Sequence, residues 1–108
     1  MTRVEFGEGV GRAPVAGPAR VLHTRADYPS LHDGDIAVVG TPDTELVLWL
    51  DRLAGIVCLT GTAESHLAML AAEADVPCLM LRSVGEEIVD GCQLVLDPAV
   101  GELRIAQA

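Results

Sequence analysis

Aromatic side chains are scarce in this sequence of 108 residues, and basic side chains are few. Phe6, Tyr28 and Trp49 are the only aromatic residues, so the core must be built from aliphatic side chains, which a hydrophobic share of 50% supplies. A formal net charge of −9 excludes nucleic acid and anionic membranes as expected partners, because both need a basic patch. The length fits one domain over residues 1–108.

Paired cysteines and long apolar runs are also missing. Cys58, Cys78 and Cys92 are odd in number and contain no CxxC pair. We expect reduced thiols, two of them inside apolar runs as small hydrophobes. No apolar run approaches the roughly 18 residues that a membrane helix needs. Arg3 and Glu5 stand where a signal peptide would have its apolar region. These absences predict a cytoplasmic chain.

The order of the apolar runs predicts an α/β fold. Residues 1–16, rich in glycine and proline, are expected to be largely loop. Short aliphatic runs predict strands, and apolar spacing predicts two helices; the strands are 19–23, 36–40, 56–60, 76–81, 92–97 and 102–106, the helices 42–55 and about 65–74. Ser83 and Glu86 form a capping box typical of a further short helix. Alternation of strand and helix indicates parallel strands, and the last two strands indicate a hairpin.

One histidine lies at a predicted boundary between loop and helix. His66 follows a loop that begins with Thr60 and Gly61. The N–H groups at a helix start are unpaired, and the helix dipole favours an anion there. Gly61 lets the backbone approach a ligand closely, and Thr60, Thr62 and Ser65 add hydroxyl groups. This set suits a phosphate group, and a neutral imidazole beside it can attack phosphorus. His66 is therefore a candidate catalytic nucleophile, with Gly61, Thr62 and Ser65 as candidate phosphate-binding loop.

The residues around His66 resemble a family motif. The sequence reads GTAESHLAMLAAEADVPCL over 61–79, against a family pattern of G-G-x-T/L-S/C-H-x-A-I-x-A-R-E-x-G-I-P-A-V. The chain is similar to the swivelling phosphohistidine domain of phosphoenolpyruvate-utilising enzymes. Identical positions are Gly61, Ser65, His66, Ala68, Ala71, Glu73 and Pro77. Similar segments extend the resemblance over nearly the whole chain: GPARV at 17–21, HDGDIAVVG at 32–40 and IVDGCQLVLDPAVGELRI at 88–105.

The resemblance implies a compact β/β/α swivelling phosphohistidine domain. In it, His66 takes a phosphoryl group on Nε2 at one site and the domain swings to deliver it at another. It implies no cofactor bound by this chain, since phosphoenolpyruvate or ATP on a partner donates the phosphoryl group. A chain of 108 residues has no room for the nucleotide-binding or phosphoenolpyruvate-binding domains, so these are expected on partner chains of a split phosphotransferase. The expected role is a carrier component, and not a complete enzyme.

Departures from the motif leave two alternatives open. Thr62 replaces the second family glycine, Glu64 a neutral residue, Ala72 an arginine and Asp75 a glycine. A carboxylate near His66 repels a phosphoryl group, which favours a non-catalytic swivelling or interaction module that kept the fold. The other alternative is a small subunit of a dehydratase-type enzyme, closing over a substrate held by another chain.

The remaining polar residues have simpler interpretations. His23 ends a predicted strand and His32 lies in a turn, so both are expected to be solvated. Trp49 is expected in the core. Aspartates in turns bond nearby backbone, which explains them better than a cation site, and we expect no metal; they are Asp33, Asp35, Asp90 and Asp97.

Overall fold

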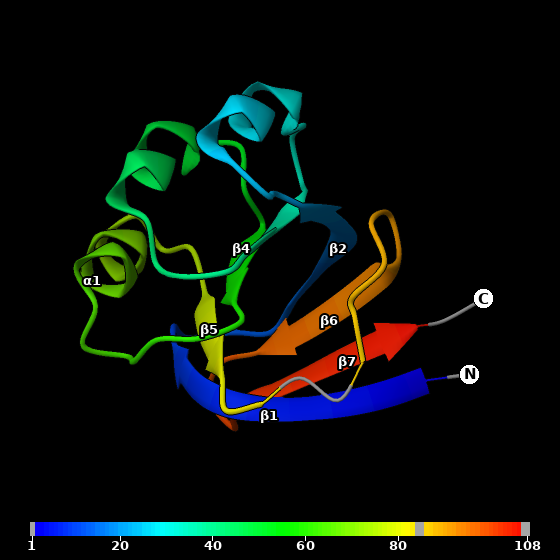
Figure 1. Ribbon diagram of the computed structural model, residues 1–108. Helices are drawn as coiled ribbons and strands as arrows, with labels where there is room; N and C mark the ends of the chain where they lie inside the picture. The colour runs from blue at the N-terminus through cyan, green and yellow to red at the C-terminus, as the bar shows by residue number, and fades with distance from the viewer. Residues whose placement is uncertain (1, 84–85, 107–108) are drawn as a thin grey trace.

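The computed structural model describes residues 2–83 and 86–106, and in this part of the chain seven strands form a closed barrel. The strands are β1 (Thr2–Val10), β2 (Val15–Val21), β3 (Ile36–Val39), β4 (Gly55–Cys58), β5 (Cys78–Leu81), β6 (Gln93–Asp97) and β7 (Glu102–Ala106). Two 3₁₀ helices, η1 (Arg25–Ser30) and η2 (Thr44–Trp49), and the helix α1 (His66–Glu73) lie together on one side of the barrel (Figure 1).

The barrel order is β1-β5-β4-β3-β2-β6-β7. Strands β2, β3, β4 and β5 run parallel to one another, as the alternation of strand and helix predicted. Strand β6 pairs antiparallel with both β2 and β7, so the predicted C-terminal hairpin is confirmed. Strand β1 pairs antiparallel with β7 through its first half and with β5 through its second. The mixed α/β class is therefore confirmed.

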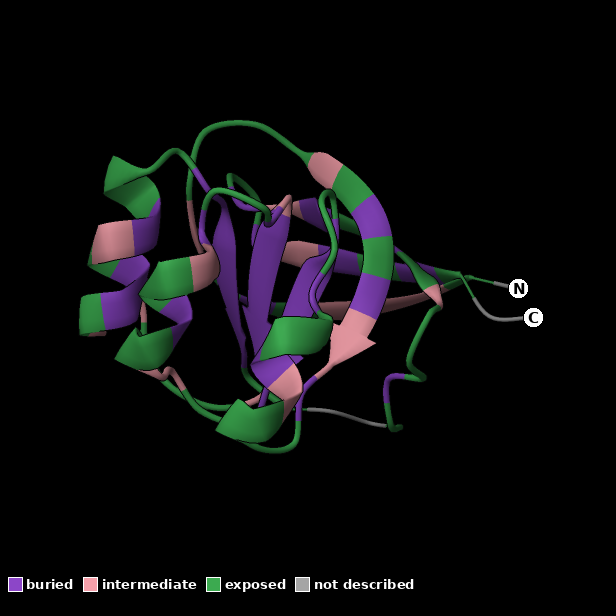
Figure 2. Ribbon diagram, turned by 90° about the horizontal axis from the view of Figure 1, so that it is seen from above, coloured by how far each residue is buried: buried purple, intermediate pink, exposed green. Residues whose placement is uncertain are grey.

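The parallel strands β3, β4 and β5 are buried along their whole length, as Figure 2 shows in purple. Successive side chains of a strand point to opposite faces. Ala37 and Val39 of β3 accordingly join the cluster beneath the helices, while Ile36 and Val38 join the cluster inside the barrel. Because both faces of β3, β4 and β5 are covered, their sequences are continuous aliphatic runs without alternating polar residues.

The first strand corrects the prediction that residues 1–16 are largely loop. Strand β1 covers Thr2–Val10, and β2 begins at Val15. Gly7 is one of the glycines that suggested a loop. A Cβ on Gly7 would lie 2.1 Å from the carbonyl oxygen of Met80. The residue is glycine because two backbones nearly touch there, and not because the chain turns.

The predicted helix 42–55 is also wrong in type and length. Only Thr44–Trp49 is helical, and it is wound as 3₁₀. The apolar spacing that suggested this helix does mark its buried side, since Leu46, Leu50 and Leu53 are buried and Trp49 packs partly buried against the same core. Buried side chains three and four residues apart suit either winding, so periodicity does not separate the two.

Three other expectations concern single segments. The helix expected after Ser83 would begin in 84–85, outside the described residues, and residues 86–89 are in neither helix nor strand. Cys58 and Cys78 are buried free thiols, as predicted, with Cys78 Sγ 3.5 Å from Met80 Sδ. Within residues 2–83 and 86–106, no helix combines the length and apolar character needed to cross a membrane.

Candidate functional site

His66 lies at the edge of the barrel where the parallel strands end. Strand β4 finishes at Cys58, and residues 59–65 lead from it into α1. The loop is anchored to the end of β3, because both the backbone N–H and the hydroxyl of Thr60 donate to the Gly40 carbonyl at 3.0 Å. Ligands commonly bind at the carboxyl ends of parallel strands in α/β proteins. The histidine loop is thus held in place at an edge suited to binding.

The start of α1 is capped by a serine. Ser65 has extended backbone angles, and its Oγ accepts a hydrogen bond from the Ala68 N–H at 3.1 Å. This arrangement makes Ser65 the N-cap and His66 the first helical residue. Capping satisfies one first-turn N–H group, while the N–H groups of His66 and Leu67 have no carbonyl within the helix to bond. The dipole of α1 adds partial positive charge at the same point.

The His66 side chain is exposed. Within residues 2–83 and 86–106 its imidazole has no hydrogen-bond or ion-pair partner, and in particular no ion pair joins it to Glu64. The ring is therefore neither packed inward nor held by the neighbouring carboxylate.

Gly61 has the backbone conformation that only glycine adopts readily. Its φ is +119°, and a Cβ there would lie 2.7 Å from Cγ of Pro42. The histidine loop therefore packs directly against the segment that follows β3. A side chain at position 61 would push these two loops apart.

A polar network at the surface, with the buried Tyr28 at its inner end, holds that second segment. Asp43 accepts two hydrogen bonds from Arg25, each 2.9 Å, and one of 2.7 Å from the Tyr28 hydroxyl. It also caps η2, because its Oδ1 accepts from the Glu45 N–H at 3.2 Å. The Arg25 guanidinium lowers the pKa of Asp43 to about 2 from 3.8, although partial burial acts in the opposite direction. Burial and the Asp43 bond raise the pKa of Tyr28.

Replacing Asp43 with alanine is expected to lower the free energy of unfolding by about 2 kcal/mol at neutral pH, because a cap and a paired carboxylate are lost together. The pKa of Asp43 is depressed by folding, so its contribution is present above pH 4 and fades as the pH falls toward about 2. Urea unfolding between pH 7 and pH 2 should therefore show a weaker acid dependence in Asp43→Ala. Asp51→Ala, which removes an exposed carboxylate, is the control, and equal losses in both variants would contradict the assignment.

Replacing Ser65 with alanine is expected to cost about 1 kcal/mol of folding stability, the usual effect of removing an N-cap acceptor. Ser65→Asn keeps an oxygen at the cap and should stay close to wild type. Urea denaturation of the three proteins measures the difference. The capping role would be refuted by an asparagine variant as unstable as the alanine variant.

The structure brings the predicted site residues together in one loop and helix start. Gly61, Thr62, Ser65 and His66 all lie between the end of β4 and the first turn of α1, and Thr62 is exposed. Thr60 was predicted as a further donor to phosphate. Its hydroxyl instead donates to Gly40, which serves the loop anchor.

The motif departures fall mostly on the outer surface. Asp75 has a φ of +61°, which explains why the resembled pattern places glycine there. The turn is completed by a hydrogen bond of 2.8 Å from the Val76 N–H to the Ala71 carbonyl. Ala72 and Glu64 are exposed and affect the charge of the surface around His66.

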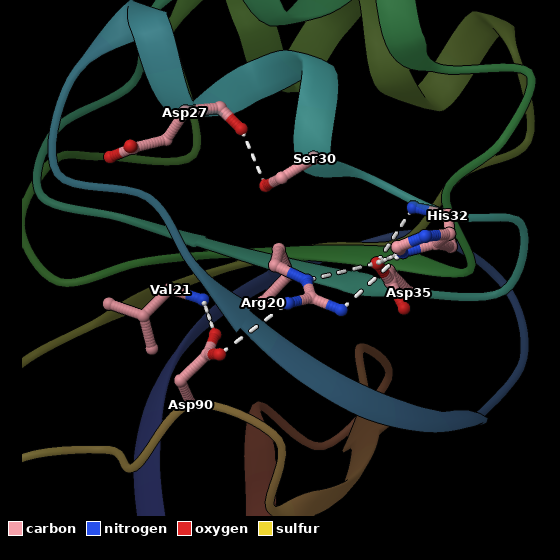
Figure 3. Close-up of polar contacts among 7 residues, drawn as sticks. All are labelled: Arg20, Val21, Asp27, Ser30, His32, Asp35 and Asp90. Carbon is pink, nitrogen blue, oxygen red and sulfur yellow. Dashed lines mark hydrogen bonds and ion pairs between the residues drawn. The ribbon is translucent and has the colours of Figure 1, made fainter.

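His32, Asp35 and Asp90 form polar contacts with Arg20 and with nearby backbone (Figure 3). Arg20 lies between Asp35 and Asp90, with N···O distances of 3.4 and 3.5 Å, and 3.5 Å from His32 Nδ1. Asp35 accepts from the His32 N–H within its own turn, as predicted, whereas Asp90 accepts from Val21 on β2. In the part of the chain described, no group of three potential ligands is arranged to hold a metal ion.

Comparison with known proteins gives one matching family. The family described as PEP-utilising enzyme, mobile domain matches residues 31–101, a range that contains the whole histidine loop. A phosphoenolpyruvate-protein phosphotransferase of Haloferax volcanii is 36% identical over 86 residues, which is 75% of this chain and 15% of the relative. A phosphoenolpyruvate synthase of Escherichia coli is 25% identical over 97 residues, which is 89% of this chain and 12% of the relative. The chain thus spans less than a fifth of either relative.

A solved structure shares the fold at low identity. Aconitase X of Thermococcus kodakaraensis, in its holo form, matches with a TM-score of 0.68 and 16% identity. The match covers 97% of this chain and 99% of that chain. At this identity the likeness concerns the fold alone.

Proposed function

The chain belongs to the family of mobile domains of PEP-utilising enzymes, and from this membership we propose that it is a phosphohistidine carrier, with His66 as the residue that holds the phosphoryl group. The observation that carries the proposal is the position of His66. Its ring is exposed, with no partner among the described residues, at the first position of a capped helix inside the segment that the family matches.

The chemistry follows from the state of the ring. Neutral imidazole, with its proton on Nδ1, offers the lone pair of Nε2 to phosphorus. An N–P bond forms as the bond from phosphorus to the donor oxygen breaks, and that oxygen keeps the electron pair. The donor is phosphoenolpyruvate or ATP on a partner, leaving enolpyruvate or ADP. Transfer to an acceptor reverses the step, as the acceptor oxygen attacks phosphorus and Nε2 regains its lone pair.

The start of α1 favours the phosphorylated form of His66. Unpaired N–H groups and the helix dipole stabilise a phosphoryl anion there, by roughly 0.3–1 kcal/mol at an exposed position. The Ser65 hydroxyl proton remains free to donate to a phosphoryl oxygen, because Ser65 Oγ acts as acceptor toward Ala68. This local arrangement acts against the net charge of −9, which opposes phosphate generally.

In this proposal the barrel with its helices moves as one swivelling unit between two sites. The first site phosphorylates His66, and the second uses the phosphoryl group. Nucleotide-binding, phosphoenolpyruvate-binding or acceptor-binding domains supply these sites, and the chain itself binds no cofactor.

The test is transfer of label from a donor. The chain is incubated with labelled ATP or phosphoenolpyruvate and with each purified protein from the same genome that carries an ATP-grasp or phosphoenolpyruvate-binding domain. Label that is stable in base, labile in acid and located on His66 by mass spectrometry is the expected result. Absence of label with every one of these proteins would overturn the proposal.

A non-catalytic interaction module is the second candidate, and the exposed Glu64 favours it. Its carboxylate lies two residues before His66, and Ala72 supplies no positive charge to offset it. A module of this kind assembles with its partners and supports their activity without any phosphorylated form. Unchanged activity of the assembly after His66→Ala would select this function.

A further inference from the structure

The helices next to His66 expose apolar side chains to solvent. Leu48 and Val47 of η2 are 69% and 37% exposed, and Met69 of α1 is 57% exposed. Helix α1 packs against η2, and the two helices lie side by side on the same side of the barrel (Figure 1). Met69 is three residues after His66, so both lie on one face of α1. We call Val47, Leu48 and Met69 the apolar helical face.

Acidic side chains lie on both helices of this face and in the segments joined to them. The exposed carboxylates between 41 and 76 belong to both helices and to three connecting segments: Glu45, Asp51, Glu64, Glu73 and Asp75. Arg52 is the one lysine or arginine in that stretch of sequence, and its guanidinium lies 5.4 Å from the centre of the Trp49 ring. In this cation–π contact the Arg52 guanidinium already interacts with a side chain of the same chain. Arg25 of η1, which packs on η2, is likewise engaged within the chain, since it pairs with Asp43 at 2.9 Å. The rim of the apolar helical face is therefore acidic on balance.

The other exposed apolar residues lie in a different electrostatic setting. Phe6 of β1, Val89, Val95 of β6 and Val100 are 55%, 63%, 38% and 65% exposed. Arginine lies near three of them, because Arg3 is on β1 with Phe6, Arg104 of β7 lies opposite Val95 in the ladder, and Arg20 pairs with Asp90, the residue after Val89. Arg104 and Arg3 also lie beside acidic neighbours, Arg104 with Glu102 at 2.7 Å and Arg3 with Glu5 at 3.4 Å. Because both signs of charge lie beside these residues, their surface favours neither a basic nor an acidic partner, whereas the acidic rim favours a basic one.

We propose that the apolar helical face is the docking surface for a partner domain with an apolar centre and a rim of lysine and arginine. The inference rests on the proposed function, because a carrier must dock before transfer, and it adds the chemistry of the partner. Docking on this face covers Leu48 and Met69 and leaves His66 at the edge of the contact. The acidic rim attracts a basic partner and repels a second copy of this chain.

Binding to the proteins used in the labelling test, each purified, tests the surface. Wild type is expected to bind at least one of them, and the double variant Leu48→Asp, Met69→Asp to bind about ten-fold or more weakly, because each change puts a charge into an apolar contact. Val100→Asp is the matched control, an equally exposed apolar residue in the turn before β7, and should bind as wild type does. Raising the salt from about 50 mM to about 500 mM should weaken binding, since the rim charges are solvent-exposed.

Cross-linking locates the contact independently. The chain contains no lysine, so it supplies no side-chain amine, and its carbodiimide-activated carboxylates couple to amines of the partner. Cross-links are expected at Glu64, Glu73 or Glu45. Absence of binding, binding that the double variant leaves unchanged, or cross-links confined to Glu8 and Glu102 would overturn the proposal.

The experiments can refute the phosphorylation proposal and the docking proposal independently of each other. His66→Ala should bind as tightly as wild type, because the histidine is at the edge of the contact. Binding at the apolar helical face without labelling would leave docking in place and refute the carrier. Labelling of His66, together with binding that the Leu48→Asp, Met69→Asp variant leaves unchanged, would support the carrier and refute docking on the apolar helical face.

Discussion

Alanine in place of His66 is expected to reduce acid-labile labelling of the chain to background, a loss of about a hundred-fold or more, because the variant lacks the imidazole proposed to take the phosphoryl group. The remaining histidines provide controls. His23 follows β2, so it lies at the same edge of the parallel strands as His66. His32 precedes β3 at the opposite edge and is 3.5 Å from Arg20. His23→Ala and His32→Ala should both be labelled like wild type.

Folding of the His66 variant is expected to be unchanged, since the exposed ring contributes no contact to the core. Circular dichroism and urea unfolding of all three variants check this. Labelling retained in His66→Ala but lost in His23→Ala would assign the carrier role to the other histidine at this edge. The donor and the conditions are the same for each variant, so the comparison measures the ring alone.

Alanine in place of Gly7 is expected to lower the free energy of unfolding by about 3 kcal/mol or more, or to prevent folding. The added Cβ would lie 2.1 Å from the Met80 carbonyl oxygen and 2.8 Å from Cα of Leu81. Backbone atoms cannot rotate away as a flexible side chain can. The Gly7 N–H also donates to the Gly101 carbonyl at 2.9 Å, so a shift of β1 breaks a second contact.

Gly40→Ala is the matched control for this prediction. A Cβ at Gly40 meets nothing within 4 Å, and its φ is not in the left-handed region. Its stability should therefore stay within about 0.5 kcal/mol of wild type. Urea or thermal unfolding measures both variants, and a Gly7→Ala protein as stable as Gly40→Ala would show that β1 can move away from β5.

The sequence predicted the centre of the fold well because the evidence there is local. Strands β3, β4 and β5 are continuous aliphatic runs, and the aspartate-glycine turn before β6 predicts where that strand begins. The first strand was missed because its glycines depend on distant partners. Gly7 pairs with Leu81, more than 70 positions away, and no local pattern records that approach.

In the candidate site, too, the features that depend on neighbouring residues were predicted, and those that depend on distant residues were not. Ser65 and His66 were placed at the helix start from sequence, because capping depends on neighbouring residues. Thr60 was assigned to phosphate, although its hydroxyl donates to the carbonyl of Gly40, which directly follows β3. The network of Arg25, Tyr28 and Asp43 was not predicted at all. Its only local signal is an aspartate before a helix, and the partners come from η1.

Pairing of β1 with β7 has a mechanical consequence. Thr2 lies opposite Ala106, so the two ends of the described chain meet at one corner, while α1 lies on the other side of the molecule (Figure 1). Any segment joined at either end would leave from that corner, and the domain would turn about it as a lever about a single pivot. With a longest dimension of 33 Å, a modest rotation at the corner would carry the first turn of α1 through a wide arc.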